Sequence, residues 1–324
     1  MYDSLTTAEE RILQMTKANL QKKRQSSEEE KQEAFQFMAH QGEVSASYHE
    51  KIFHSALTAA GVDPSALAKR HEKERNSVVN FLAKRKHRAM KLAVELKKQH
   101  LQDIAERTKR IHSLENLPRP QPGIVALLRS ATDIQLNGQR GNVSIAPEQN
   151  LVRTKVERLG WVSALKWDLR GDMAIADWHF LWTPPRTGLL NVLSALSMNG
   201  WGFAYPGPGC IKGSSSWSID AGIVITQLGL NGEPLTDSVQ MRVDEQRFDS
   251  SDFPSSGGVI LTANTLDSIT ALSYQNQYVA LAQVPMIITV SAILYVLVAH
   301  GEAELNFMDG DFQLNVPFVY LFLD

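Results

Sequence analysis

Histidine, aspartate and cysteine are the residues of this chain that could take part in catalysis or hold a metal ion. Seven of the nine histidines precede residue 115, and none has the His-Glu-x-x-His spacing of a helical zinc site. A cupin-type metal site combines a His-x-His pair with a glutamate. Asp177-Trp178-His179 and His300-Gly301-Glu302 each supply only one histidine. The sequence therefore predicts no metal site and no cofactor.

Two other segments contain residue types found in calcium sites or in nucleophilic catalysis. Asp309-Gly310-Asp311 lacks the further oxygen ligands of a calcium loop, and a hairpin turn explains it better. Cys210 follows the turn-rich segment Tyr205–Gly209, and no base that would activate its thiol is evident nearby. An enzyme whose groups converge only in space stays open. Because no catalytic motif is present, we predict that the protein is not an enzyme.

The tryptophans and one acidic stretch are the candidate ligand contacts. All six tryptophans follow residue 160, and most of them are expected in a core. Trp201 and Trp217 adjoin turn-like segments, where an indole ring could stack on a sugar. The second candidate surface is the acidic stretch 244–252. The predicted ligand contacts are Trp201, Trp217, Asp244, Asp249 and Asp252.

The elements that position these residues fall into two unlike parts, joined after a long segment without glycine or proline. Asp63 is a helix N-cap followed by Pro64, and Gly61 ends the preceding helix. No glycine or proline then occurs between Ser65 and Leu117. This pattern predicts one very long helix. Its imperfect apolar heptads favour a helical bundle over a self-associating coiled-coil stalk.

The long segment is strongly basic. Residues 64–114 carry 14 Lys and Arg against 5 Asp and Glu, whereas the parts before and after are acidic. The simplest interpretation is a helix face exposed to solvent. The more specific interpretation is a helix face that binds an anionic membrane surface. The sequence argues against nucleic acid as a partner, because Phe81 is the segment's single aromatic residue and base stacking has little support. The basic surface candidates are Lys84, Arg85, Lys86, Arg88 and Lys91.

The N-terminal residues are expected to be helical as well. Thr7-Ala8-Glu9-Glu10 fits a capping box for a first helix over Ala8–Arg24, with Ile12, Met15 and Leu20 facing inward. Residues 1–20 lack the apolar core of a signal peptide. We therefore expect cytoplasmic synthesis, with release by lysis or dedicated export still open. The single cysteine is compatible with a reducing compartment.

The chain after the prolines reads as β-structure. The predicted division is a helical domain over residues 1–117, a proline-rich joint over residues 118–123 and a β-sandwich domain over residues 124–324. Asn-Gly pairs at Asn137-Gly138, Asn199-Gly200 and Asn231-Gly232 suit hairpin turns between strand-like runs. The fold class is thus α+β and multidomain: an N-terminal all-α helical bundle or coiled-coil region with one very long helix, and a C-terminal antiparallel β-sandwich resembling a jelly roll.

Two apolar stretches need their own interpretation. Tyr278–Ala299 has no charged residue, but Pro285 interrupts it and strand formers dominate its second half. We interpret it as two strands, with Met286–Ala299 central in the sandwich. The last strand, Val316–Leu323, is apolar on both faces. A strand of that kind is buried twice, which predicts a homo-oligomer, with a trimer as the guess.

These features favour a non-enzymatic binding or assembly protein. Its helical region would present an oligomeric β-sandwich head, and loops of the head would contact a glycan or protein ligand. The alternative is a membrane-active, pore-forming toxin, in which the helical region inserts and the sandwich binds a receptor. The basic amphipathic segment motivates this alternative.

Overall fold

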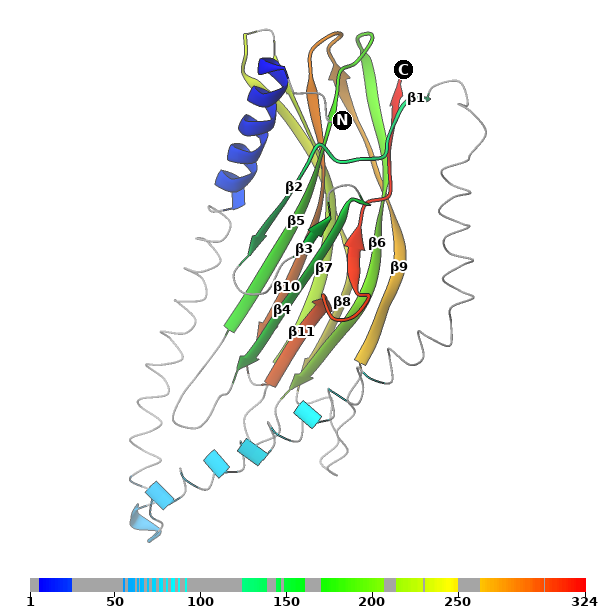
Figure 1. The fold of residues 1–324 in the computed structure, drawn as a ribbon. Coiled ribbons are helices and arrows are strands. Elements are labelled where there is room, and N and C mark those ends of the chain that lie inside the picture. Colours follow the sequence, from blue (N-terminus) through cyan, green and yellow to red (C-terminus); the bar gives the residue numbers. More distant parts are fainter. Residues whose placement is uncertain are drawn as a thin grey trace.

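A computed structural model of the protein describes most of the chain after residue 123 and one stretch before it. The described ranges are residues 6–24, 124–138, 144–146, 149–160, 170–206, 214–229, 231–249, 263–299 and 301–324, with scattered positions between residues 55 and 91. Within these ranges, residues 7–24 form a helix, and strands form nearly all the other regular structure (Figure 1).

The strands are long and pair only in antiparallel fashion. They are β1 (Ile124–Leu128), β2 (Asp133–Gly138), β3 (Ser144–Ala146), β4 (Leu151–Gly160), β5 (Arg170–Trp182), β6 (Gly188–Pro206), β7 (Ser214–Leu228), β8 (Pro234–Asp249), β9 (Ala263–Ala280), β10 (Met286–Val298), β11 (Gly301–Phe307), β12 (Gln313–Asn315) and β13 (Val319–Leu323).

These strands make two sheets that face each other. The larger sheet has eight strands, in the order β1-β13-β6-β11-β4-β12, with β3 on β4 and β9 on β6. The smaller sheet has five strands, in the order β2-β5-β10-β7-β8. Up to β11 the chain changes sheet at each connection except β3–β4 and β7–β8. The antiparallel β-sandwich is therefore confirmed.

The core lies between the two sheets and explains the most apolar stretch of the sequence. β10 runs between β5 and β7, and its first seven residues are all buried. Trp178 and Phe180 from β5 enter the same core with no exposed area. The prediction that Met286–Ala299 forms a central strand is confirmed. Among the described residues, no helix has the length and apolar content needed to cross a bilayer.

The predicted α+β fold class, with an all-α helical bundle or coiled-coil region and one very long helix, is wrong, because the described part of the chain is mostly β-sheet with one short N-terminal helix. The helix over residues 7–24 packs on the smaller sheet (Figure 1). Its Ile12 and Leu13 contact Ile287 of β10. Its apolar face is thus buried by strands, which removes the need for partner helices. The capping box is present one residue earlier than expected: the backbone N–H of Thr6 donates to Glu9 Oε2 at 2.8 Å.

The sequence signals around residue 61 behave locally as expected. Gly61 has φ +71° and donates its N–H to the carbonyl of Thr58 at 3.0 Å. Asp63 Oδ1 accepts the N–H of Ser65 at 2.9 Å, as an N-cap does. The described residues between 65 and 91 have helical backbone and exposed side chains. Most of the segment predicted as the very long helix, like the joint over residues 118–123, lies outside the described residues.

The Asn-Gly pairs have different outcomes. Asn231-Gly232 lies in the turn between β7 and β8, where Gly232 has φ +81°, so this hairpin prediction is confirmed. Asn199-Gly200 lies inside β6, so the turn predicted there is wrong. A Cβ atom on Gly200 would lie 2.5 Å from both the carbonyl oxygen of Asn306 and the ring of Phe307. Glycine is needed at this position for close packing and not for a turn.

The last strand is apolar on both faces, as expected. Val319, Leu321 and Leu323 of β13 belong to the core between the sheets. Phe318 and Tyr320 belong to a separate cluster, with ring centroids 4.9 Å apart. Apolar side chains of the same chain therefore contact part of this second face of β13. The homo-oligomer stays a prediction.

Candidate functional site

The outer face of the larger sheet carries a stacked aromatic pair. Side chains alternate along a strand, and Ala204 and Met198 of β6 belong to the core, so Trp201 and Phe203 lie on the outer side. Their rings stack, with centroids 5.9 Å apart and 20° between the planes. Trp201 is 1% exposed and Phe203 is 2% exposed. The pair is therefore a buried part of this face, with both rings covered.

A buried carboxylate lies next to this pair. Glu304 of β11 is opposite Phe203 in the register and has no exposed area. Its Oε1 accepts from Asn306 Nδ2 at 3.0 Å and from Trp201 Nε1 at 3.5 Å, and Lys155 Nζ lies at 3.4 Å. An amide, an indole and an ammonium group thus compensate the charge of the carboxylate.

Asn306 also shapes the loop between β11 and β12. Its Nδ2 donates to Asp309 Oδ2 at 2.6 Å, and its Oδ1 accepts the N–H of Met308 at 3.0 Å. β11 and β12 both pair with β4 on one side and β6 on the other. The chain therefore leaves the sheet at this loop and re-enters it at the same position between β4 and β6. Asp309-Gly310-Asp311 is therefore a turn, with φ +62° at Gly310, but the turn does not join paired strands as a hairpin would.

A row of side-chain amides continues from this loop along the outer face. Asn199 of β6 is opposite Gln313 of β12, and Asn315 is opposite Ser197. We call Asn199, Gln313 and Asn315 the amide row. All three are half-buried, and Oδ1 of Asn315 is buried without a hydrogen-bond partner among the described residues. The row thus holds one buried acceptor that the described part of the chain leaves unmatched.

The other end of the same face is apolar. Leu189 of β6 and Val279 of β9 are opposite each other and are 43% and 50% exposed. A cluster of apolar side chains lies on the same face. It comprises Leu127, Leu193, Ala195, Ile269, Phe318, Tyr320 and Phe322. We call Leu189 and Val279 with this cluster the apolar patch.

The structure does not bring the predicted ligand contacts together. Trp217 of β7 lies in the core between the sheets, 1% exposed, and its Nε1 donates to Gln246 Oε1 at 3.2 Å. Asp244 is exposed on β8 of the smaller sheet, away from Trp201. Asp249 ends β8, and its side chain, like all of Asp252, is outside the described part of the structure. Their contact roles stay predictions.

The basic surface candidates are only partly described. Lys84 and Lys91 have helical backbone and exposed side chains. Arg85, Lys86 and Arg88 lie outside the described residues. Their predicted role at an anionic surface therefore stays a prediction.

Sequence reasoning missed a second polar cluster, where the N-terminal helix meets the smaller sheet. Both terminal nitrogens of Arg24 bind the carboxylate of Asp177, one of them at 2.5 Å, and Ser291 Oγ donates to it at 2.6 Å. Nδ1 of His179 lies 2.9 Å from Thr289 Oγ1. We call these five residues the docking cluster. The alternation of Asp177 and His179 with core residues of β5 was the signal available in the sequence.

The docking cluster does not have the arrangement of a catalytic triad. In a triad the imidazole links the nucleophile to the carboxylate, whereas here Nδ1 of His179 is bound to Thr289 and Nε2 has no hydrogen-bond partner among the described residues, while Asp177 binds Ser291 and Arg24. Asp177, His179 and Thr289 have no exposed area. Burial lowers the pKa of His179 to about 4, against attraction from Asp177 and Asp133. The imidazole is thus neutral at pH 7.

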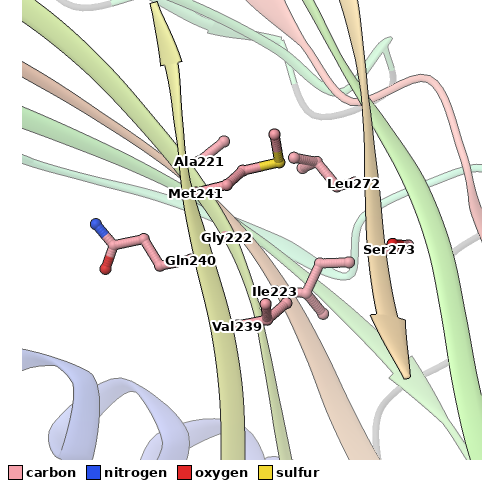
Figure 2. A pocket seen from close by; sticks show the side chains of 8 residues that line it. All are labelled: Ala221, Gly222, Ile223, Val239, Gln240, Met241, Leu272 and Ser273. Atoms are coloured by element: carbon pink, nitrogen blue, oxygen red, sulfur yellow. The ribbon is translucent and has the colours of Figure 1, made fainter. Parts of the chain in front are cut away.

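The described residues form no metal site, and the pocket that described residues of β7, β8 and β9 line is small. The described residues contain no group of three or more His, Cys, Asp or Glu side chains placed to hold a metal ion. A pocket between β7, β8 and β9 has about 20 Å³, which is room for about one water molecule. Figure 2 shows the side chain of Met241 extending toward Leu272 across this pocket.

Comparisons with known proteins do not assign the chain to a family. No family model and no curated protein matches it. A carbohydrate-binding module, TmCBM61 in complex with β-1,4-galactotriose, matches 60% of this chain and 91% of its own, with 12% identity and a TM-score of 0.24.

Two further solved structures are more distant. The enzymatically active domain of bacteriophage CBA120 tailspike protein 4 matches 59% of this chain, which spans 19% of that one, with 12% identity and a TM-score of 0.16. The infectious bursal disease virus Gx strain matches 64% of this chain and 41% of its own, with 8% identity and a TM-score of 0.12. Similarities of this size support no conclusion about fold or function.

Proposed function

We propose that the protein is a non-enzymatic binding protein that holds a glycan on the outer face of its larger sheet. The observation that carries the proposal is the amide row beside a buried carboxylate and an aromatic pair. Gln313 and Asn315 lie on one strand, next to the loop that Asn306 holds in place. The polar groups of this face are thus fixed by paired strands on both sides.

Side-chain amides suit sugar hydroxyls because each amide offers two donors and one acceptor oxygen. The hydroxyl group of a sugar is itself a donor and an acceptor, so it can complete an amide's hydrogen bonds from either side. Asn315 Oδ1 supports this choice of ligand, because it is an acceptor with no partner among the described residues. The oxygen is buried, so a hydroxyl donor of a bound sugar would satisfy it once the half-buried Asn315 side chain turns outward.

The test is a glycan array followed by calorimetry with the best-binding oligosaccharide. We expect the double variant Gln313→Ala/Asn315→Ala to bind roughly 30-fold more weakly, from two hydrogen bonds of about 1 kcal/mol each. Gln240→Ala is the matched control, since Gln240 is an exposed amide on β8 of the other sheet. Its affinity should equal that of the wild type.

Two results would overturn the proposal. The first is a folded wild-type protein that binds no glycan on a broad array. The second is an equal loss of affinity in the double variant and in the Gln240→Ala control, because the amide row would then have no special part in binding.

A protein partner is the second candidate ligand, and the apolar patch favours it. Exposed apolar side chains that adjoin one another mark surfaces for association. Leu189 and Val279 form such a pair across β6 and β9. If a second copy of the chain covers the patch, light scattering should show an oligomer for the wild type and a monomer for Leu189→Asp/Val279→Asp. A wild-type monomer at micromolar concentration would exclude this occupant.

A further inference from the structure

The outer face of the smaller sheet is occupied by the N-terminal helix, which is tied to it by both apolar and ionic contacts. Ile12 and Leu13 pack on Ile287, with Leu181 and Leu228 alongside. One turn further along the helix, Lys17 pairs with Asp133 of β2. These contacts come from one side of the helix, which accounts for its amphipathic sequence.

The strongest tie is ionic and lies at the end of the described helix. Arg24 binds Asp177 through both terminal nitrogens, while Ser291 donates to the same carboxylate. Asp177 has no exposed area, and the Arg24 side chain is 16% exposed. A paired geometry of this kind is strong because both charges keep their hydrogen bonds after leaving water.

His179 lies in the middle of this interface with one ring nitrogen unmatched. Its Nδ1 is bound to Thr289, and its Nε2 is buried with no hydrogen-bond partner among the described residues. The ring has no exposed area. Four elements surround it. They contribute Asp133 from β2, Asp177 from β5, Thr289 and Ser291 from β10, and Lys17 and Arg24 from the helix.

We propose that the outer face of the smaller sheet is an acid-sensitive docking surface for residues 7–24, which holds the helix while His179 is neutral and releases it when His179 is protonated. This inference is independent of the proposed glycan binding, because it concerns the opposite sheet. The partner of the outer face of the smaller sheet is the chain's own N-terminal helix, and the condition for release of the helix is protonation of His179.

Charge balance explains the direction of the effect. Two carboxylates and two cations surround His179, so their charges already cancel at neutral pH. A proton on His179 adds an uncompensated positive charge at a side chain with no exposed area. Both nearby cations, Lys17 and Arg24, belong to the helix, and they are repelled by the new charge. Release of the helix opens the imidazolium to solvent.

The pH range follows from linkage. Burial holds the pKa of His179 at about 4, below its ordinary value of 6.5. The released state therefore binds the proton more tightly, so docking is strongest above pH 6.5 and weakens as the pH falls toward 4. With these two values, the docking equilibrium should be about 30-fold weaker at pH 5 than at pH 8.

Hydrogen exchange on the full chain tests the proposal. Protection factors, corrected for the intrinsic pH dependence of exchange, are measured for residues 7–24 and for β10 at pH 8 and pH 5. We expect helix protection to fall by up to about 30-fold at pH 5, while protection of β10 is kept. His179→Gln should remove the pH dependence, because glutamine does not titrate.

Two variants complete the design. His87→Gln is the matched control, since His87 is exposed and has helical backbone, and it should behave as the wild type. Arg24→Ala should reduce helix protection at both pH values with β10 intact. The proposal is overturned if wild-type helix protection is equal at the two pH values, if His179→Gln keeps the loss, or if Arg24→Ala leaves the helix as protected as in the wild type.

Discussion

Buried charged and polar side chains are the most informative residues of this protein, and each is compensated in a different way. Asp177 is held by a guanidinium from the helix, whereas Glu304 is held by side chains of its own sheet. Sequence spacing could not pair these residues, because Arg24 and Asp177 are 153 positions apart. The residue types can be read from the sequence, but the fold determines which of these side chains come into contact.

The ion pair under the helix makes a prediction at the same scale. Asp177→Ala leaves Arg24 without its buried partner, and removal of one member of such a pair costs about 3 kcal/mol of unfolding free energy. Urea unfolding followed by fluorescence would measure the loss. Asp244→Ala is the control, because Asp244 is exposed on β8. A loss in Asp177→Ala no greater than in the control would show that the pair does not stabilise the folded state.

The strands show which sequence patterns are sufficient to define an element. β10 was predictable because a two-sided apolar run bounded by a proline fits a central strand. The end of β6 was not, because Asn199-Gly200 has the composition of a hairpin turn. The helix over residues 7–24 was predictable from its cap and period, but its partner was not, because an apolar stripe does not specify whether a helix or a sheet covers it.

Close packing inside β6 gives a prediction for this element. Gly200→Ala would place a methyl group against the carbonyl of Asn306 and the ring of Phe307, so β6 and β11 must separate. Overpacking of this kind costs about 1–3 kcal/mol. Thermal unfolding would show a lowered Tm. An unchanged Tm would mean that β11 moves aside freely, contrary to a tightly packed larger sheet.

At the scale of the molecule, the two outer faces of the sandwich differ in what covers them. The smaller sheet is covered at one end by the chain's own helix (Figure 1). The larger sheet carries the amide row and the apolar patch. The sequence predicted a sandwich that binds a ligand, but it placed the contacts on tryptophans and loop aspartates. Trp217 illustrates why the contacts were misplaced: it lies in the core. A tryptophan in a strand beside a turn gives the same sequence pattern whether its indole faces the core or the solvent.

The assignment of the binding face is tested most directly by a hydrogen-exchange footprint. The protein is compared with and without a saturating amount of the best-binding oligosaccharide from the array. We predict that the ligand slows exchange in β12 and in residues 308–312, and leaves β8 and the helix over residues 7–24 unchanged. Slowed exchange confined to β8 or the helix, with none at β12, would contradict the account.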